Sequence, residues 1–159
     1  MKKSVTWSNV SVIITVVVMC ILVCGMIFSR DKQPEYTVFA VMIALVIIVM
    51  WYYSPVSVTV DDRAVVVKKR ISVKTIPISS IESVAPFTPS PWVNQRMCGS
   101  AGFAGYWGWF ADSDIGRYFG YFGQTSDCFL LQLKNGRRYV LGCDDSPSVV
   151  SYISDLIVK

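Results

Sequence analysis

Two long uncharged stretches set the pattern of hydrophobic and polar positions in the first third of the chain. No charged residue occurs from residue 4 to 29 or from residue 36 to 60. Their apolar cores, at about 10–28 and 36–53, each approach the roughly 20 residues that a helix needs to cross about 30 Å of hydrocarbon. The pattern therefore predicts a transmembrane hairpin of two helices within residues 1–53.

A secretory signal peptide followed by a buried core helix is the alternative interpretation. Lys2 and Lys3 resemble the basic start of such a peptide. The apolar region of a signal peptide is only about 7–15 residues long, however, and a small-residue cleavage site follows it. No such site lies cleanly near Ser29, so the pattern favours two spans.

The distribution of basic residues predicts the orientation of the hairpin. Two lysines precede the first predicted span, and Arg30 and Lys32 lie in the loop between the spans. Five more basic residues follow the second span: Arg63, Lys68, Lys69, Arg70 and Lys74. Cytoplasmic flanks are rich in Lys and Arg. Aromatic residues gather at membrane interfaces, as Trp7 would before the first span and Trp51, Tyr52 and Tyr53 at the end of the second. We therefore predict a multi-pass protein of the bacterial cell (inner) membrane, with both termini cytoplasmic.

From residue 54 the sequence changes to short β-type runs and turns. Val56, Val58 and Val60 alternate with polar residues, as in a half-buried strand. Residues 64–74 continue with β-branched residues among basic ones, and residues 75–84 predict two strands separated by a break at a proline. The remaining length, about 100 residues, is enough for one small domain with its own core.

A β-hairpin and a helix are predicted at the end of the chain. Residues 128–133 and 138–143 have strand character, and the Asn135-Gly136 pair between them is favoured in tight hairpin turns. Ser146 can cap a helix that starts at Pro147. The apolar residues of this helix recur at helical spacing: Val149, Val150, Ile153, Leu156 and Ile157.

This order of elements resembles a bacterial pleckstrin-homology-like (bacterial PH) domain protein with an N-terminal two-helix membrane hairpin. The resemblance rests on Ile-Pro-Ile-Ser-Ser-Ile-Glu-Ser-Val from residue 76, a middle segment rich in glycine and aromatic residues, and Leu-x-Asn-Gly-x-x-Tyr-Val from residue 133. It implies an antiparallel β domain, a sandwich or half-barrel, closed by a C-terminal α-helix, and it implies no catalytic residues. The expected domains are the transmembrane α-hairpin at 1–53 and a cytoplasmic PH-like domain at 54–159.

The segment from residue 86 to 124 interleaves glycines with aromatic residues, and two interpretations stay open. The aromatic side chains can fill the core while glycine permits close strand packing. Alternatively, they form a contact surface for lipid, peptide or a partner protein, with at least one Trp exposed. Trp107 and Trp109 would share one face of a strand, and we expect them to be buried or exposed together. The candidate surface consists of Arg96, Tyr106, Trp107, Trp109, Arg117, Tyr118 and Tyr121.

The basic run also has two interpretations. Lys68, Lys69, Arg70 and Lys74 are candidate lipid-facing residues, because each basic charge near an anionic membrane surface contributes about 1 kcal/mol of attraction. The same residues can equally form the solvated face of a strand. The sequence alone leaves this choice open.

Little in the sequence points to catalysis or metal binding. The chain has no His, the commonest general base and metal ligand. Cys98, Cys128 and Cys143 lack Cys-x-x-Cys spacing, and we expect reduced, mostly buried thiols. Asp144 and Asp145 fit a turn and cap before the last helix. We therefore predict no enzyme activity, no cofactor, no metal site and no nucleic-acid partner.

The predicted function is that of a noncatalytic membrane-anchored interaction protein. It would present a PH-like module to the inner face of the membrane for association with lipid, with a protein partner or with further copies of itself. The alternative is an accessory subunit of an envelope transport, secretion or assembly complex that docks through its spans. A transporter is disfavoured, because neither predicted span carries a charged residue at mid-membrane depth.

Overall fold

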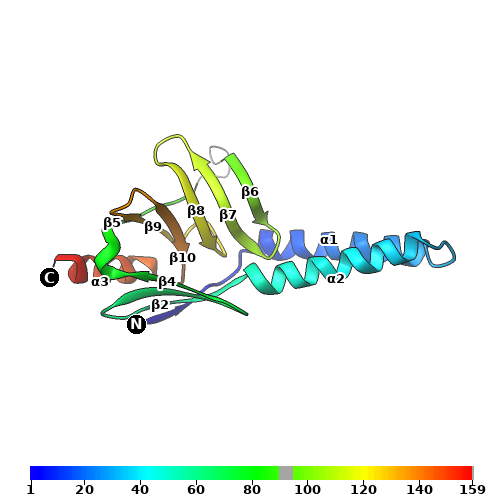
Figure 1. Ribbon diagram of the computed structural model, residues 1–159, viewed down its shortest axis with the longest axis horizontal. Coiled ribbons are helices and arrows are strands. Elements are labelled where there is room, and N and C mark those ends of the chain that lie inside the picture. The colour runs from blue at the N-terminus through cyan, green and yellow to red at the C-terminus, as the bar shows by residue number, and fades with distance from the viewer. Residues whose placement is uncertain (90–94, 159) are drawn as a thin grey trace.

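Figure 1 shows a β domain from which two long helices extend as a hairpin. The computed structural model describes residues 1–89 and 95–158 and, at residues 95, 96 and 101, the backbone alone. The helices are α1 (Asn9–Phe28) and α2 (Glu35–Tyr53), within one residue of the predicted spans. Both helices are long and apolar enough to cross a membrane.

Most side chains of the two helices are uncovered. Within the two helices, the buried residues are Ser11 and Leu22 of α1, and α2 has none. The first turn of α1 is capped by Ser8, whose hydroxyl oxygen accepts a hydrogen bond from the Ser11 amide at 3.1 Å. A helix that is apolar on all sides and largely uncovered by other elements is typical of a segment surrounded by lipid.

Four antiparallel strands form the first sheet, in the order β1-β2-β3-β4. They are β1 (Lys2–Ser4), β2 (Pro55–Val60), β3 (Ala64–Lys69) and β4 (Val73–Pro77). The run at 64–74 is divided between two strands, because the chain reverses after Lys69, whose amide donates to the Ser72 carbonyl at 2.9 Å. Alternate residues of β2 and β3 are buried, so one face of this sheet is turned toward the core.

Strand β1 precedes the first helix and has no counterpart in the sequence-based expectations. It pairs with β2, so that Lys3 lies opposite Val58. The segment between β1 and α1 is also attached to the β domain, because the Ser8 amide donates to the Gly123 carbonyl at 3.0 Å. The chain therefore leaves the β domain into α1 and returns to it from α2 at the same end of the hairpin.

Six strands form the second sheet, in the order β5-β9-β10-β8-β7-β6. They are β5 (Ile81–Pro86), β6 (Gln95–Gly102), β7 (Gly105–Asp112), β8 (Gly116–Phe122), β9 (Cys128–Leu133) and β10 (Arg138–Gly142). A short 3-10 helix, η1 (Ile78–Ser80), stands at the predicted break before β5. Neighbouring strands are antiparallel except β8 and β10, which run parallel with Phe119 opposite Tyr139. The predicted antiparallel fold is confirmed apart from this one pair.

The main core lies between the two sheets and the last helix, α3 (Ser146–Val158). Val149 and Ile153 are 1% and 0% exposed and pack against the strands. The predicted closing helix is thus confirmed, although it begins at Ser146 and not at Pro147. The hydroxyl of Ser148 donates to the Asp145 carboxylate at 2.8 Å. The side chain bonded to the first turn of the helix is therefore that of Asp145, whereas the sequence predicted Ser146 in this role.

We predict that Ile153→Asp strongly destabilises the protein. The aspartate would place an unpaired charge in the main core, and the expected loss is at least about 3 kcal/mol of unfolding free energy. Val158→Asp is the matched control, because Val158 lies on the same helix and is 87% exposed. Its expected effect is within about 0.5 kcal/mol.

Urea unfolding of the full chain in mild detergent, followed by circular dichroism, measures both changes. Equal midpoints for Ile153→Asp and the unsubstituted protein would show that α3 is not part of the core.

Candidate functional site at the junction of helix and sheet

Aromatic residues at the end of α2 pack directly against the β domain. Tyr53 stacks on Trp107 of β7, with ring centroids 4.4 Å apart and ring planes 13° apart. Tyr52 meets the Tyr53 ring edge-on, at a centroid distance of 4.9 Å. The sequence assigns these tyrosines to a membrane-interface belt and gives no sign of their partners, because the contacts join distant parts of the chain. We call the group the junction, and it consists of Tyr52, Tyr53, Lys69, Trp107 and Tyr121.

Lys69 is the charged residue of the junction. It continues the inward-facing row of Val65 and Val67 on β3 and is only 9% exposed. Its ammonium nitrogen lies 5.5 Å from the ring centroid of Tyr52, 5.8 Å from that of Tyr53 and 5.3 Å from that of Tyr121. Burial lowers the pKa of Lys69 from its ordinary value, and the charge of nearby Lys74 lowers it further. Cation–π contacts with the three rings offset part of this unfavourable burial.

The four basic residues predicted to face lipid do not form one exposed face. Lys74 lies opposite Val67 in the β3–β4 pair, so it shares the inward side, where it contacts the Tyr139 ring at 5.6 Å. Lys68 and Arg70 are exposed, as alternation along a strand requires. The prediction of an exposed basic run is therefore wrong for Lys69, whose side chain is buried against tyrosine rings.

An open groove of about 520 Å³ lies where α2 passes into the sheet. Arg70 stands over the Trp51 ring at 5.8 Å on one side of this groove, and Ile71, 62% exposed, forms part of its wall. We call it the exit groove, and its lining residues are Trp51, Val56, Lys68, Lys69, Arg70 and Ile71. Among the described residues no carboxylate lines it, so its polar chemistry suits an anion.

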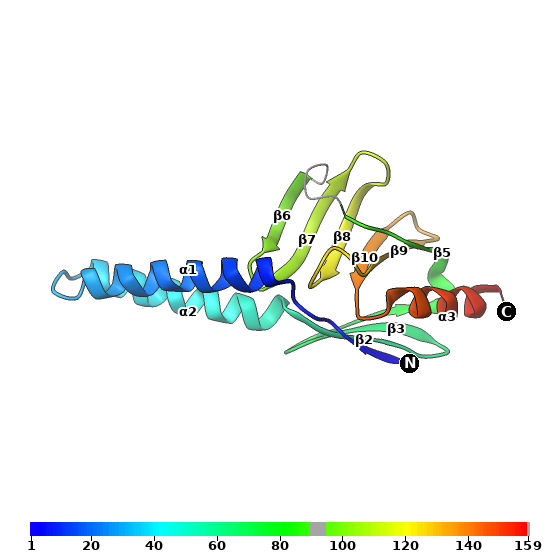
Figure 2. The ribbon, with the colours of Figure 1, turned by 180° about the vertical axis from the view of Figure 1, so that it is seen from behind.

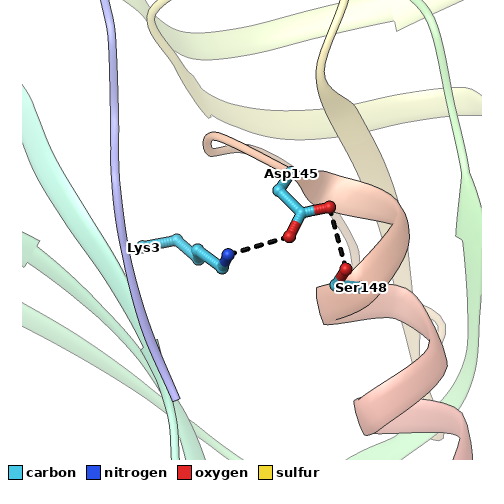
Figure 3. A network of polar contacts seen from close by, with 3 residues as sticks. All are labelled: Lys3, Asp145 and Ser148. Atoms are coloured by element: carbon cyan, nitrogen blue, oxygen red, sulfur yellow. Dashed lines mark hydrogen bonds and ion pairs between the residues drawn. The ribbon is translucent and has the colours of Figure 1, made fainter.

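Lys69 forms no ion pair with a described carboxylate, and the ion pair that the structure contains lies elsewhere. In the described part of the chain, the one ion pair joins Lys3 of β1 to Asp145 at 2.8 Å, and Figure 3 shows Asp145 also bonded to Ser148. The hydrogen bond from Lys3, followed by that from Ser148, lowers the pKa of Asp145. This exposed network attaches β1 to the start of α3 and confirms the turn role expected for Asp145.

The glycine and aromatic residues of β7 and β8 alternate between two environments. Tyr118 is fully buried in a second apolar cluster, on the face of the sheet opposite the main core, and burial raises its pKa. Tyr121 is 7% exposed within the main core, and burial raises its pKa to about 12. Both residues are therefore core residues, and they are removed from the candidate contact surface.

The other candidate surface residues differ in exposure. Trp109 is 47% exposed and Arg117 is exposed, whereas Tyr106 is half-buried and stacks on Phe122 at 4.9 Å. Trp107 shares the face of Trp109, as predicted, but Tyr53 covers its ring. The expectation that the two tryptophans are buried or exposed together is therefore wrong. The side chain of Arg96 lies outside the described residues.

Glycine has a specific role where β6 and β7 approach. Gly99 lies opposite Gly108, and both have positive φ angles, 129° and 123°. A Cβ atom on either residue would run into the backbone of the facing strand. This close approach supports the packing interpretation for these two glycines.

Metal-binding and nucleophilic side chains are sparse among the described residues. Within residues 1–89 and 95–158, no group of three Cys, Asp or Glu side chains is placed to hold a metal ion. Cys128 and Cys143 are buried, and burial raises the pKa of Cys143 to about 12. These thiols are therefore protonated at neutral pH and behave as small apolar residues.

Comparison with protein families identifies the class of the β domain. A family model described as a bacterial PH domain matches residues 56–155. The chain belongs to the bacterial PH domain family. Searches of curated proteins and of solved structures found no match. Family membership confirms the resemblance seen in the sequence, and the bacterial PH domain assignment names no ligand or partner.

We predict unequal effects for the two tryptophans of β7. Trp107→Ala removes the ring that stacks on Tyr53 and should lower the free energy of unfolding by about 3 kcal/mol. Trp109→Ala changes an exposed ring and should stay within about 0.5 kcal/mol. Urea unfolding of both full-length variants in mild detergent checks the difference, and equal losses would contradict the assigned environments.

Proposed function

We propose that this chain is a noncatalytic, membrane-anchored interaction protein. Its two helices hold the bacterial PH domain against the inner face of the cell membrane, where the domain associates with anionic lipid and with a protein partner or further copies of the chain. The observation that carries the proposal is the position of the exit groove. It combines exposed cations with Trp51 at the point where an apolar helix passes directly into the domain.

The anchoring part is supported by the hairpin and by its attachment. Both helices are long and apolar enough to span a bilayer. Pairing of β1 with β2 keeps the residues before α1 and those after α2 at one end of the hairpin. Because basic residues are more numerous at this end than in the loop at 30–35, the domain is expected on the cytoplasmic side.

This orientation predicts that the loop between the helices is external. A Gln33→Cys variant, made in a background without the native thiols, should react with a membrane-impermeant maleimide in intact cells. An Asn135→Cys variant, placed in the β9–β10 turn, should react only after the cells are lysed. Labelling of position 135 but not of position 33 in intact cells would reverse the orientation.

The lipid part is supported by charge and burial. Lys68, Lys69 and Arg70 line the groove, Lys68 and Arg70 are exposed, and no carboxylate of the described residues lines it. Anionic lipid headgroups are attracted by about 1 kcal/mol for each basic residue near the membrane surface. A phosphate in the groove would also supply the counter-charge that the buried Lys69 lacks among the described residues.

We predict that the full chain in neutral detergent binds short-chain phosphatidylglycerol more tightly than phosphatidylcholine. Tryptophan fluorescence can measure this, because Trp51 lines the groove. Arg70→Gln should weaken the affinity for phosphatidylglycerol about fivefold, the equivalent of one lost surface charge. Lys68→Gln should have a similar effect.

The matched control is Arg137→Gln, which removes an exposed cation from the β9–β10 turn. It should leave the affinity unchanged. Equal binding of the two lipids, or an equal loss in the Arg137→Gln variant, would contradict a lipid role for the exit groove.

A further inference from the structure

Strand β6 is the edge of the second sheet that lies closest to the helices. In both ribbon views β6 and β7 run across the helix axes, and β6 lies on the side toward which the helices extend (Figures 1 and 2). This strand and its turn therefore lie in the same surroundings as the nearest turns of α1 and α2. In the proposed anchoring this surrounding material is the lipid leaflet next to the domain.

The turn between β6 and β7 contacts α1 beyond its first turn. The Ala104 amide donates to the Thr15 hydroxyl oxygen at 2.9 Å. Thr15 lies six residues after Asn9, the first residue of α1. At 1.5 Å per residue, the contact is about 9 Å along the helix from its start.

The β6–β7 hairpin, which consists of these two strands and their turn, also lies beside α2. An apolar groove of about 360 Å³ runs between them, with Leu45 and Val49 of α2 on one side and Phe103 and Trp107 on the other. Leu45 precedes Trp51 by six residues, so the groove reaches about 9 Å deeper along α2 than this aromatic residue. Trp side chains near the ends of spans mark the headgroup level, and the groove therefore extends beyond that level toward the acyl chains.

Two polar groups of the turn, the Phe103 carbonyl and the Ala104 amide, are bonded within the protein. The Ser100 hydroxyl donates to the Phe103 carbonyl at 2.6 Å, and the Ala104 amide is bonded to Thr15. Ala104 itself is 0% exposed. Such internal pairing is what irregular backbone requires where water is scarce, because unpaired backbone groups are costly in lipid.

The outer part of the hairpin exposes large apolar side chains. Met97 of β6 is 51% exposed and Trp109 of β7 is 47% exposed. Tryptophan is enriched at the membrane interface, where its ring meets both apolar and polar surroundings. In the β6–β7 hairpin, polar groups of the turn are thus hydrogen-bonded within the protein, and large apolar side chains of the strands are exposed.

We propose that the β6–β7 hairpin lies in the interfacial layer of the adjacent leaflet and binds phospholipid, with an acyl chain in the groove beside α2. The proposal rests on the proposed function, because depth is counted along helices that span the membrane. Phospholipid is favoured over a second copy as the occupant, since apolar helix surface continues the groove on the lipid side. Headgroups and interfacial water would bond the outer backbone groups of β6, which has no second partner strand among the described residues.

Spin-label accessibility tests this placement in the full chain. A nitroxide is attached to Met97→Cys, with native Cys20, Cys24 and Cys98 replaced by Ser, and the protein is reconstituted in phosphatidylcholine nanodiscs. Oxygen reports exposure to lipid and a water-soluble nickel complex reports exposure to water. Val41→Cys in α2 and Asn135→Cys in the β9–β10 turn provide the lipid and water references.

We expect the oxygen-to-nickel accessibility ratio at position 97 to be shifted from the value at position 135 toward that at position 41. A ratio at 97 equal to that at 135, with position 41 in lipid, overturns the inference and leaves the anchoring intact. Spectral broadening between labels at 97 of two chains, with neither agent reaching them, shows that a second copy covers β6 and also overturns it. A water-exposed position 41 overturns the proposed anchoring itself.

The contact with Thr15 supplies a second variant that leaves the label site unchanged. Thr15→Val removes the acceptor of the Ala104 amide, and the ratio at position 97 should shift toward the water reference. Thr15→Ser keeps the acceptor and should preserve the original ratio. If both variants behave alike while α1 and α2 remain helical, this bond does not hold the hairpin at the membrane.

Discussion

The direct passage of α2 into β2 is the constraint on which the arrangement of this protein depends. Ser54 is the single residue between them, so the last turn of the helix must pack against the sheet that follows. The stack of Tyr53 on Trp107 and the contacts of Tyr52 with Lys69 fill this space. A long flexible linker would let a domain sample many orientations. Here the helix direction and the sheet direction are set together, and the bond from Thr15 to the β6–β7 turn adds a second attachment.

The buried lysine of the junction follows from its place at the end of the sandwich. Val65 and Val67 are covered by the main core, whereas Lys69, next in the inward-facing row, reaches the margin of that core beside the exit groove. A lysine suits such a margin, because its stem packs on aromatic rings while its ammonium group reaches toward polar surroundings. In the proposed lipid role, an anion in the exit groove would supply the counter-charge of this ammonium group.

Local patterns in the sequence predicted the helices and the strands outside residues 86–124, with the exception of β1, and nonlocal contacts account for much of what they did not predict. The helices followed from uncharged runs, the β9–β10 hairpin from Asn135-Gly136, and α3 from its apolar spacing. Strand β1 is a short, polar segment, and its pairing with β2 gives no periodic signal. The alternation rule alone separates Lys68 and Arg70 from Lys69, but the inward placement of Lys74 requires the β3–β4 register. The cover of Trp107 by Tyr53 likewise depends on how α2 meets the second sheet.

The two interpretations of the segment rich in glycine and aromatic residues are both needed, because its strands have two different faces and, among the described residues, an edge strand without a second partner. Tyr118 and Tyr121 are core residues on opposite faces of β8, so this strand is packed on both sides. The facing pair Gly99 and Gly108 lets β6 approach β7 closely, so the sheet extends by one more strand toward the helices. Among the described residues of this segment, Trp109 near this outer margin is the one aromatic residue that is exposed. Aromatic residues thus stabilise the inner strands, and the same composition gives the outer hairpin the surface that a membrane interface favours.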